Sequence, residues 1–286
     1  MLIAHLSDLH IRNADDARAF EHQLDRVAAR VPDHLVISGD LLDRWKPRLL
    51  GRALDALAAR GLLASGRATI IHGNHDLASS GGHPRSRADL PRLLLRFWDP
   101  PPVIAARRRR FYAEIERRAP GVAELAPFAK ELEGISIAAI DTVPLAWTPV
   151  RLSRGRLQIR QGLGCVPEAQ AEWLTRALPR GKPALLVLHH YPLPVPPFIY
   201  GRGRRRMEIE VAMEIPAADR RRLWEAACAA GVRLVLCGHV HRARLEWHDG
   251  IAVGLQGQSG APWAGRSIGW YQIGAESIEM ELERTA

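Results

Sequence analysis

The feature that most constrains the fold of this chain is a repeated unit: a short apolar run ends in polar residues, and a helical segment follows. The first apolar runs cover residues 2–6, 34–37 and 68–71, and they lead into Ser-Asp-Leu-His, Ser-Gly-Asp and Gly-Asn-His-Asp sequences. Residues 17–31 and 49–63, between these runs, have apolar residues at the spacing of an amphipathic helix. Alternating strands and helices predict a sheet with parallel strands at its centre and helices outside it.

The same unit returns in the second half of the chain. Strands are predicted at 135–140, 184–188 and 233–237, helices at 167–178 and 217–230, and short strand-like runs alternate with turns after residue 243. Residues 78–130 differ, because they combine Gly-, Pro- and Arg-rich stretches with too few apolar residues for a core of their own. We therefore predict a single domain over residues 1–286, with an insertion at about 78–130 that crosses the mouth of the sheet.

Composition is that of an ordinary globular protein. Of the 286 residues, 47% are hydrophobic and 25% are charged. No run approaches the roughly 20 apolar residues of a membrane span, and the first residues lack the basic and apolar regions of a signal peptide. The 3 cysteines are widely spaced, which favours a reducing compartment without disulfides. We therefore expect a cytoplasmic protein.

The positive charge of the chain does not identify a partner by itself. The net charge of +9 comes almost entirely from arginine. Such charge attracts phosphates and nucleic acids, but solvated helix faces and a compositional bias toward arginine account for it equally well. Nucleic acid is therefore an open but not a favoured partner.

Five predicted strand ends carry side chains that bind metals. In order along the chain they are Asp8 and His10, Asp40, Asn74 with His75, His189 with His190, and His239 with His241. Ligands bind at the carboxyl ends of strands in α/β sheets, where residues distant in sequence converge. Carboxylate, imidazole and amide groups suit Zn, Fe, Mn or Co, whereas neither a thiolate cage nor an all-oxygen calcium site is in view.

The spacing within these groups supports a shared site. In an extended segment, residues i and i+2 point to the same side, so Asp8 and His10 can bind one ion together, and His239 and His241 can face one cavity. The two carboxylate oxygens of Asp40 allow it to bridge two ions.

The ordered set of motifs resembles the calcineurin-like metallophosphoesterase family. It consists of Asp8-x-His10, Gly39-Asp40, Gly73-Asn74-His75-Asp76, His190 and Gly238-His239-x-His241, and it runs from residue 6 to residue 241. The resemblance implies a four-layer α/β/β/α sandwich with mixed sheets and a binuclear metal site at the C-terminal ends of the strands. It also implies hydrolysis of a phosphate ester by a hydroxide that bridges the two ions.

The resemblance further implies a role for each residue. Asp8, His10 and His241 would hold the first ion; Asn74, His190 and His239 would hold the second; and Asp40 would bridge them. His75 would be the acid that protonates the leaving group, and Asp76 would orient its imidazole. We prefer His190 to His189 because the family ligand often precedes a residue and then a proline, as in His190-Tyr191-Pro192-Leu193.

Within the family, the chain is similar to the bacterial class III cyclic-nucleotide phosphodiesterase branch. The similarity lies in the His-x-Pro-Leu segment and in the stretch Gln161-Gly162-Leu163…Gln170…Trp173-Leu174…Leu178. It implies a small phosphodiester as the substrate, a cyclic nucleotide among others. Three alternatives stay open: a nuclease, a pyrophosphatase for a nucleotide-linked lipid, and an inactive binding module on the same fold. The insertion at 78–130 could form a lid, a lipid-facing surface or the contact of a homo-oligomer.

Overall fold

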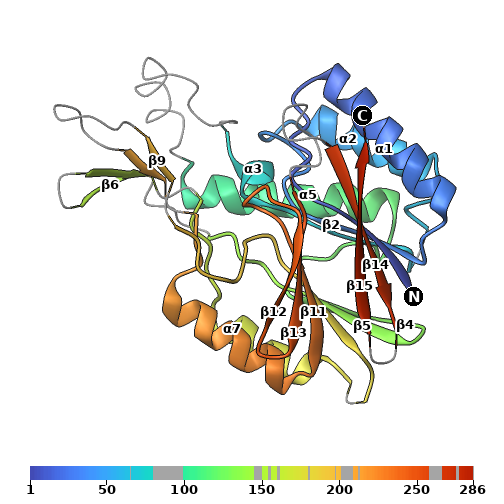
Figure 1. Cartoon of the computed structure of the whole chain (residues 1–286). Helices are drawn as coiled ribbons and strands as arrows, with labels where there is room; N and C mark the ends of the chain where they lie inside the picture. The colour runs from blue at the N-terminus through green and yellow to red at the C-terminus, as the bar shows by residue number, and fades with distance from the viewer. Residues whose placement is uncertain are drawn as a thin grey trace.

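Two mixed β-sheets face each other at the centre of the protein, and helices cover both outer surfaces (Figure 1). The structure is a computed structural model. It describes residues 1–64, 66–79, 99–144, 150–153, 156–159, 162–179, 181–196, 198–200, 209–211, 213–257, 266–274 and 277–285.

The first sheet has the strand order β15-β14-β1-β2-β3. Its strands are β1 (Leu2–Leu6), β2 (His34–Ser38), β3 (Ala68–Ile71), β14 (Arg266–Ile273) and β15 (Ile278–Thr285). β1, β2 and β3 are parallel, as the repeated strand–helix unit predicts. β14 pairs antiparallel with β1 on one side and with β15 on the other.

The second sheet has the order β12-β13-β11-β8-β5-β4. Its strands are β4 (Phe128–Leu132), β5 (Ile135–Ala139), β8 (Ala184–Val187), β11 (Val232–Cys237), β12 (Arg244–His248) and β13 (Ile251–Leu255). The four central strands are parallel, and the edge strands β4 and β12 pair antiparallel with their neighbours.

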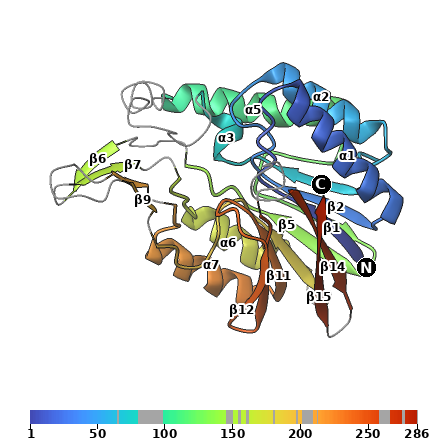
Figure 2. The same ribbon diagram turned by 45° about the horizontal axis from the view of Figure 1, so that its top comes forward.

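Helices pack on the outer face of each sheet (Figures 1 and 2). The first sheet is covered by α1 (Ala14–Arg30), α2 (Pro47–Ala58) and α5 (Pro101–Arg118), and the second by α6 (Glu168–Ala177) and α7 (Ala217–Ala229). The single turn α3 (Asn74–Leu77) follows β3 directly. A small sheet of β6 (Val150–Ser153), β7 (Arg156–Ile159), β10 (Ile209–Val211) and β9 (Phe198–Tyr200) projects from one end of the body.

Alternation along the strands produces this four-layer arrangement. In β2, Val36 points into the core between the two sheets, whereas Leu35 and Ile37 point into the core beneath the helices. A third core lies between the second sheet and helices α6 and α7. Because the central strands bury both faces, most of their residues are apolar, with buried polar exceptions such as His5 of β1 and His34 of β2. The predicted four-layer α/β/β/α sandwich with mixed sheets is confirmed.

The predicted helix boundaries shift where capping residues determine the helix start. Helix α1 begins at Ala14 because the Asn13 side chain accepts hydrogen bonds from the backbone N–H groups of Asp15 and Asp16. Helix α2 begins at Pro47, whose missing N–H costs nothing in the first turn. Hydrophobic periodicity alone placed both starts too late.

Helix α5 lies within the predicted insertion and packs into the first core. Its residues Phe111, Tyr112 and Ile115 are buried together with residues of α1 and α2. Of the insertion predicted at about 78–130, residues 80–98 lie outside the described residues, and its last residues begin the edge strand β4 of the second sheet. In the part of the chain that is described, no helix combines the length and apolar character of a membrane span.

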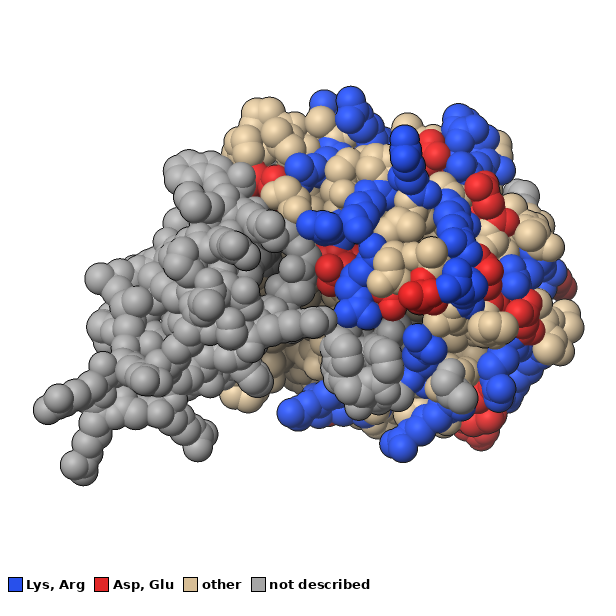
Figure 3. All heavy atoms as spheres, turned by 90° about the horizontal axis from the view of Figure 1, so that it is seen from above, with Lys and Arg blue, Asp and Glu red and all other residues tan. Residues whose placement is uncertain are grey.

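Acidic residues are interspersed with the basic ones on the helical face of the first sheet. Figure 3 shows this face, where Lys and Arg alternate with Asp and Glu. Arg26 of α1 pairs with Glu283 of β15 at 2.5 Å, and Arg60 pairs with Asp25 at 2.7 Å. Part of the positive charge of the chain is therefore neutralised locally.

The packing of α5 predicts that it unfolds together with the rest of the protein. Replacing the fully buried Ile115 by Ala should lower the free energy of unfolding by about 2–5 kcal/mol, because the substitution removes apolar contacts and leaves a cavity. Urea denaturation should show one cooperative transition with a lower midpoint. The exposed Val103 of the same helix is the control, and Val103→Ala should change stability by less than about 0.5 kcal/mol. A separate early transition in Ile115→Ala would contradict this packing.

Candidate metal centre

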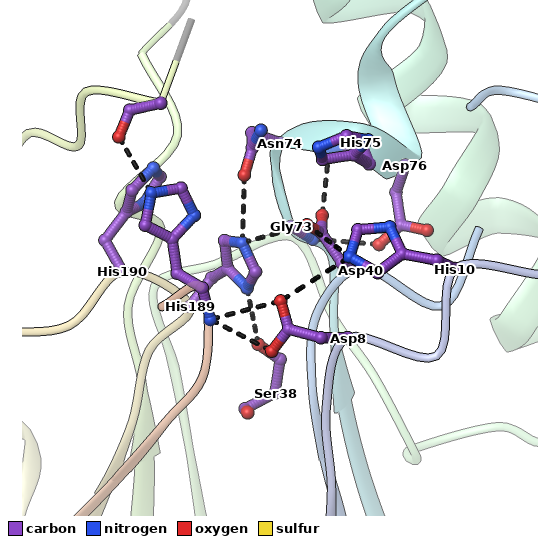
Figure 4. Close-up of polar contacts among 12 residues, drawn as sticks. Asp8, His10, Ser38, Asp40, Gly73, Asn74, His75, Asp76, His189 and His190 are labelled. Atoms are coloured by element: carbon purple, nitrogen blue, oxygen red, sulfur yellow. Dashed lines mark hydrogen bonds and ion pairs between the residues drawn. The ribbon is translucent and has the colours of Figure 1, made fainter. Parts of the chain in front are cut away.

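The strand ends of both sheets meet at one cluster of polar side chains (Figure 4). The first sheet contributes Asp8 and His10 after β1, Asp40 after β2, and Asn74 and His75 in α3 after β3; the second contributes His189 and His190 after β8, and His239 and His241 after β11. All of them except His75 and His241 are buried. Convergence of these strand ends is what the sequence predicts, and the cluster lies across the boundary between the two sheets.

Backbone hydrogen bonding continues past the ends of the strands and aligns the cluster. The N–H groups of Asp8 and His10 donate to the carbonyls of Gly39 and Asp40 at 3.1 and 2.9 Å. In the second sheet, the N–H of Gly238 donates to the carbonyl of His189 at 3.0 Å. The loops that carry the cluster are thus extensions of the two sheets.

Five residues of the cluster have left-handed backbone conformations, which non-glycine residues rarely adopt. The φ angles are 53° at Asp8, 47° at His10, 52° at Asp40, 75° at His239 and 56° at His241. Such a conformation costs about 1–3 kcal/mol per residue, and it persists only where surrounding structure imposes it. Each turn aims its side chain into the gap between the sheets instead of continuing the strand.

Two glycines allow the backbone to approach the carboxylates closely. A Cβ at Gly73 would lie 2.2 Å from Asp40 Oδ1, and a Cβ at Gly238 would lie 2.3 Å from Asp8 Oδ2. No side chain fits at these distances, so both positions require glycine. The Gly-Asn and Gly-His pairs in the sequence therefore reflect crowding around Asp40 and Asp8.

The first group of donor atoms comprises Asp8, His10 and His241. Nε2 of His241 lies 3.2 Å from Asp8 Oδ1 and 3.2 Å from Nε2 of His10, and the donor atoms of the three residues lie within 4.8 Å of one another. The Asp8 carboxylate is held by the backbone N–H of His239 at 2.9 Å. This set of one carboxylate and two imidazoles fits a divalent ion.

The second group comprises Asp40, His189 and His239, again within 4.8 Å. Nδ1 of His189 lies 2.9 Å from the carbonyl oxygen of Ser38. Because a carbonyl only accepts, Nδ1 carries the proton, and Nε2 is the lone-pair nitrogen of the neutral ring. That Nε2 lies 3.0 Å from Asn74 Oδ1 and 3.4 Å from Asp40 Oδ2. When the His189 ring is neutral, three acceptor atoms face one point, which fits a bound cation.

The His239 ring is oriented in the same way by a backbone carbonyl. Its Nε2 lies 2.9 Å from the carbonyl oxygen of Gly162, so Nε2 carries the proton and Nδ1 is the lone-pair nitrogen. Carbonyl partners of this kind commonly fix the tautomer and ring orientation of metal-binding histidines.

Electrostatics around Asp40 show how the protein balances these groups without an ion. Burial alone would raise the pKa of Asp40, but the imidazoles of His189 and His75 hold it well below its usual range. Burial alone would lower the pKa of His189, but the Asp40 carboxylate raises it to about 9. A proton on His189 thus compensates the Asp40 charge, and a metal ion would displace that proton.

Asp40 also connects the two groups. Its Oδ2 lies 3.4 Å from His189 Nε2 in the second group and 3.8 Å from Nε2 of His10 in the first. Asp40, His10 and His75 form a third set of converging donor atoms. The geometry is compatible with the bridging role predicted for Asp40.

The structure places both His189 and His190 in the cluster, but in different surroundings, and the sequence favoured His190. Nδ1 of His190 lies 2.8 Å from the Thr142 hydroxyl, and its ring centroid lies 4.3 Å from that of His239. Alternation along β8 explains the difference: Leu185 and Val187 point between the sheets, and His189 continues that face. Strand alternation therefore favours His189 and the spacing to Pro192 favours His190, so the choice between the two histidines stays a prediction.

The resemblance implies that the Asp76 carboxylate orients the His75 imidazole, but in the structure this carboxylate binds backbone groups instead. It accepts hydrogen bonds from the backbone N–H groups of Leu42 and Gly73 at 2.8 and 2.9 Å, and from that of Leu41 at 3.3 Å. Asp76 thus joins the turn after β2 to the turn after β3. Burial and the nearby Asp40 raise its pKa to about 7.

Asp43, which the sequence analysis missed, orients His75 instead. Nδ1 of His75 lies 2.9 Å from the carbonyl oxygen of Asp43, and Asp43 Oδ1 lies 3.9 Å from Nδ1 of His10. Burial would lower the pKa of His75, but Asp40 and Asp43 raise it. The available signal was the spacing of Asp43, three residues after Asp40 on the same loop.

Known proteins show similarity to this chain at the level of family and fold. The profile of the family described as calcineurin-like phosphoesterase matches residues 1–243. Among solved structures, a dimetal phosphatase from Danio rerio is similar with a TM-score of 0.62 and 11% identity, over 99% of this chain and 96% of that one. At such low identity this likeness supports the fold alone.

Two other solved structures are more weakly similar. Phosphopantetheinyl hydrolase from Mycobacterium tuberculosis has a TM-score of 0.45 and 15% identity, over 89% of both chains. An archaeal phosphodiesterase has a TM-score of 0.43 and 10% identity, over 99% of this chain and 100% of that one. The comparison with curated protein sequences gives no significant match.

The position of Asp40 predicts that its charge is required for metal binding by both groups. Asp40→Asn should keep the hydrogen bond from the His75 N–H but lose the negative charge, and it should take up markedly less Mn²⁺ than the unaltered protein. Calorimetric titration of metal-stripped protein measures this directly. The exposed Asp25 provides the control, since Asp25→Asn should bind Mn²⁺ normally. Normal Mn²⁺ uptake by Asp40→Asn would rule out a shared site.

Proposed function

The chain belongs to the calcineurin-like phosphoesterase family, and we propose that it hydrolyses a small phosphodiester at a binuclear metal centre. The observation that carries this proposal is the convergence of acceptor atoms from His189, Asn74 and Asp40 on one point. Without a metal ion, a proton on His189 compensates the Asp40 carboxylate, and a metal ion bound among the same three atoms would take the place of that proton. The neighbouring group of donor atoms around Asp8 supports a second cation.

We assign the ligands from this geometry and from the family pattern. Asp8, His10 and His241 would hold the first ion; Asn74, His189 and His239 would hold the second; and Asp40 would be shared between them. This donor set suits Mn, Fe, Zn or Co. When bound, a pair of such ions activates a water molecule and neutralises charge on the phosphoryl oxygens.

His75 is the group best suited to supply a proton to the leaving oxygen. Its Nδ1 is committed to the Asp43 carbonyl, and the edge of the ring meets the His10 ring at 4.6 Å between centroids. Burial opposes protonation of His75, but Asp40 and Asp43 raise its pKa. A general acid is most effective when its pKa lies near the working pH.

The choice of a diester rests on the resemblance to the class III phosphodiesterase branch. The residues of the resembling stretch that the structure describes support the fold. The Gln170 side chain bonds both backbone groups of Asp141 at 2.8 and 3.0 Å, and Trp173, Leu174 and Leu178 pack with the third core; Gln161 lies outside the described residues. A small phosphodiester is therefore the proposed substrate.

The experiment that tests this function compares a model diester with a model monoester. Metal-stripped protein is supplied with Mn²⁺ and assayed on bis-p-nitrophenyl phosphate and on p-nitrophenyl phosphate. We expect Mn²⁺-dependent turnover that favours the diester. Preference for the monoester would replace the diesterase proposal by a phosphatase. Absence of turnover with Mn²⁺, Zn²⁺, Co²⁺ and Fe²⁺ alike would contradict hydrolysis of simple esters.

A separate prediction concerns His75. His75→Ala should keep both metal ions, because this residue lies outside the two assigned ligand sets, and it should lower turnover by about 10²–10⁴-fold, as loss of a general acid does. The loss should be greatest for diesters with poor leaving groups. The metal content is measured alongside turnover, with His22→Ala on the exposed face of α1 as the control. Loss of an ion from His75→Ala would reassign this residue as a ligand.

A further inference from the structure

A buried polar network joins helix α5 to the ends of strands in both sheets. It consists of Arg108 and Tyr112 of α5, His72 after β3 and Asp141 after β5, which we call the α5 clamp. The Tyr112 hydroxyl lies 2.8 Å from His72 Nδ1, and His72 Nε2 lies 3.2 Å from Asp141 Oδ1. Arg108 Nε lies 3.0 Å from Asp141 Oδ2, an ion pair without the alignment of a hydrogen bond.

Each end of the α5 clamp is tied further into its surroundings. Arg108 also donates from its guanidinium to the Val143 carbonyl at 2.7 Å, and the Val143 N–H donates to Asp141 Oδ1 at 2.8 Å. Gln170 of α6 holds the backbone of Asp141 from the opposite side. The loop after β5 is thus fixed between α5 and α6.

The two strand ends that the α5 clamp joins lead directly to the second group of donor atoms. His72 is two residues before Asn74 in the first sheet. Asp141 precedes Thr142, whose hydroxyl contacts both the ring and the backbone N–H of His190, beside His189 in the second sheet. The distance between Asn74 and His189 therefore depends on how the two sheets sit at these ends.

We propose that the α5 clamp positions the two halves of the second metal site, with Arg108 and Asp141 as positioning residues. This inference rests on the proposed function. A buried ion pair contributes little net stability, because desolvation offsets its attraction. Its position between the sheets fixes how they lie relative to each other instead. The Arg108 guanidinium on α5 binds Asp141 of the second sheet, and Asp141 in turn contacts His72 of the first.

The four consecutive arginines at 107–110 have different surroundings. Arg107 pairs with Asp99 at 2.9 Å and donates to the Leu77 carbonyl at 2.7 Å, and Arg108 belongs to the α5 clamp. Arg109 and Arg110 are exposed. Only the first two arginines therefore have a role in holding the strand ends, and Arg109 provides a matched control on the same helix.

The test is calorimetric titration of the metal-stripped full chain with Mn²⁺, together with the EPR signal of exchange-coupled Mn²⁺ pairs. Arg108→Ala should lose about tenfold in affinity for one of the two ions, in the range found when supporting partners of metal ligands are removed. At limiting Mn²⁺ the coupled signal should fall and the signal of isolated Mn²⁺ should rise. Tyr112→Phe, which keeps the ring packing, should shift the same affinity in the same direction by a smaller factor.

Two controls separate positioning from general stability. Arg109→Ala should bind both ions normally. Phe20→Leu weakens the first core away from the site and should lower the urea midpoint without changing either affinity. Unchanged affinities in both Arg108→Ala and Tyr112→Phe would overturn the α5 clamp while leaving the proposed function intact. Failure of the unaltered chain to bind Mn²⁺ would overturn the proposed function, and the inference with it.

Discussion

Nε2 of His189, an oxygen of Asp40 and the amide oxygen of Asn74 face one another across the boundary between the two sheets. Without a metal ion, a proton on His189 compensates the Asp40 charge. When His189 is neutral, as metal binding requires, these three acceptors repel each other unless a cation lies among them. The surrounding structure must therefore hold them in place against that repulsion. Many of the unusual local features of this protein are explained by that requirement.

Backbone geometry meets part of this requirement. The left-handed turns at Asp8, Asp40 and His239 redirect side chains that would otherwise follow the pleat of a strand. Gly73 and Gly238 let a second backbone segment come close to each carboxylate. The carboxylate of Asp76, which accepts backbone N–H groups from two loops, holds the turn after β2 against the turn after β3. Main-chain groups therefore supply many of the contacts that hold the site.

The sequence predicted the layers of the fold and the residues of the site better than their individual contacts. Apolar runs with polar ends are a local signal, so the strands, most helices and the converging side chains could be read directly. The partner of the His75 ring could not, because it is the backbone carbonyl of Asp43, and the spacing of Asp43 after Asp40 places the residue near the site without indicating this contact. For the choice between His189 and His190, the proline spacing favours His190 and the alternation of β8 favours His189, because only the alternation reports which face of the strand a side chain occupies.

The pairing of β14 has a consequence for how the chain folds. β14, at Arg266–Ile273, lies beside β1, and the backbone N–H of Ile273 bonds the carbonyl of Met1. Of the two neighbours of β1, β2 follows it closely in the chain, whereas β14 begins only at Arg266. Until β14 is synthesised, β1 has an open edge, which other chains can pair with. A sheet completed by so distant a segment folds slowly. A partly folded chain in which this edge of β1 is unpaired is therefore prone to aggregation.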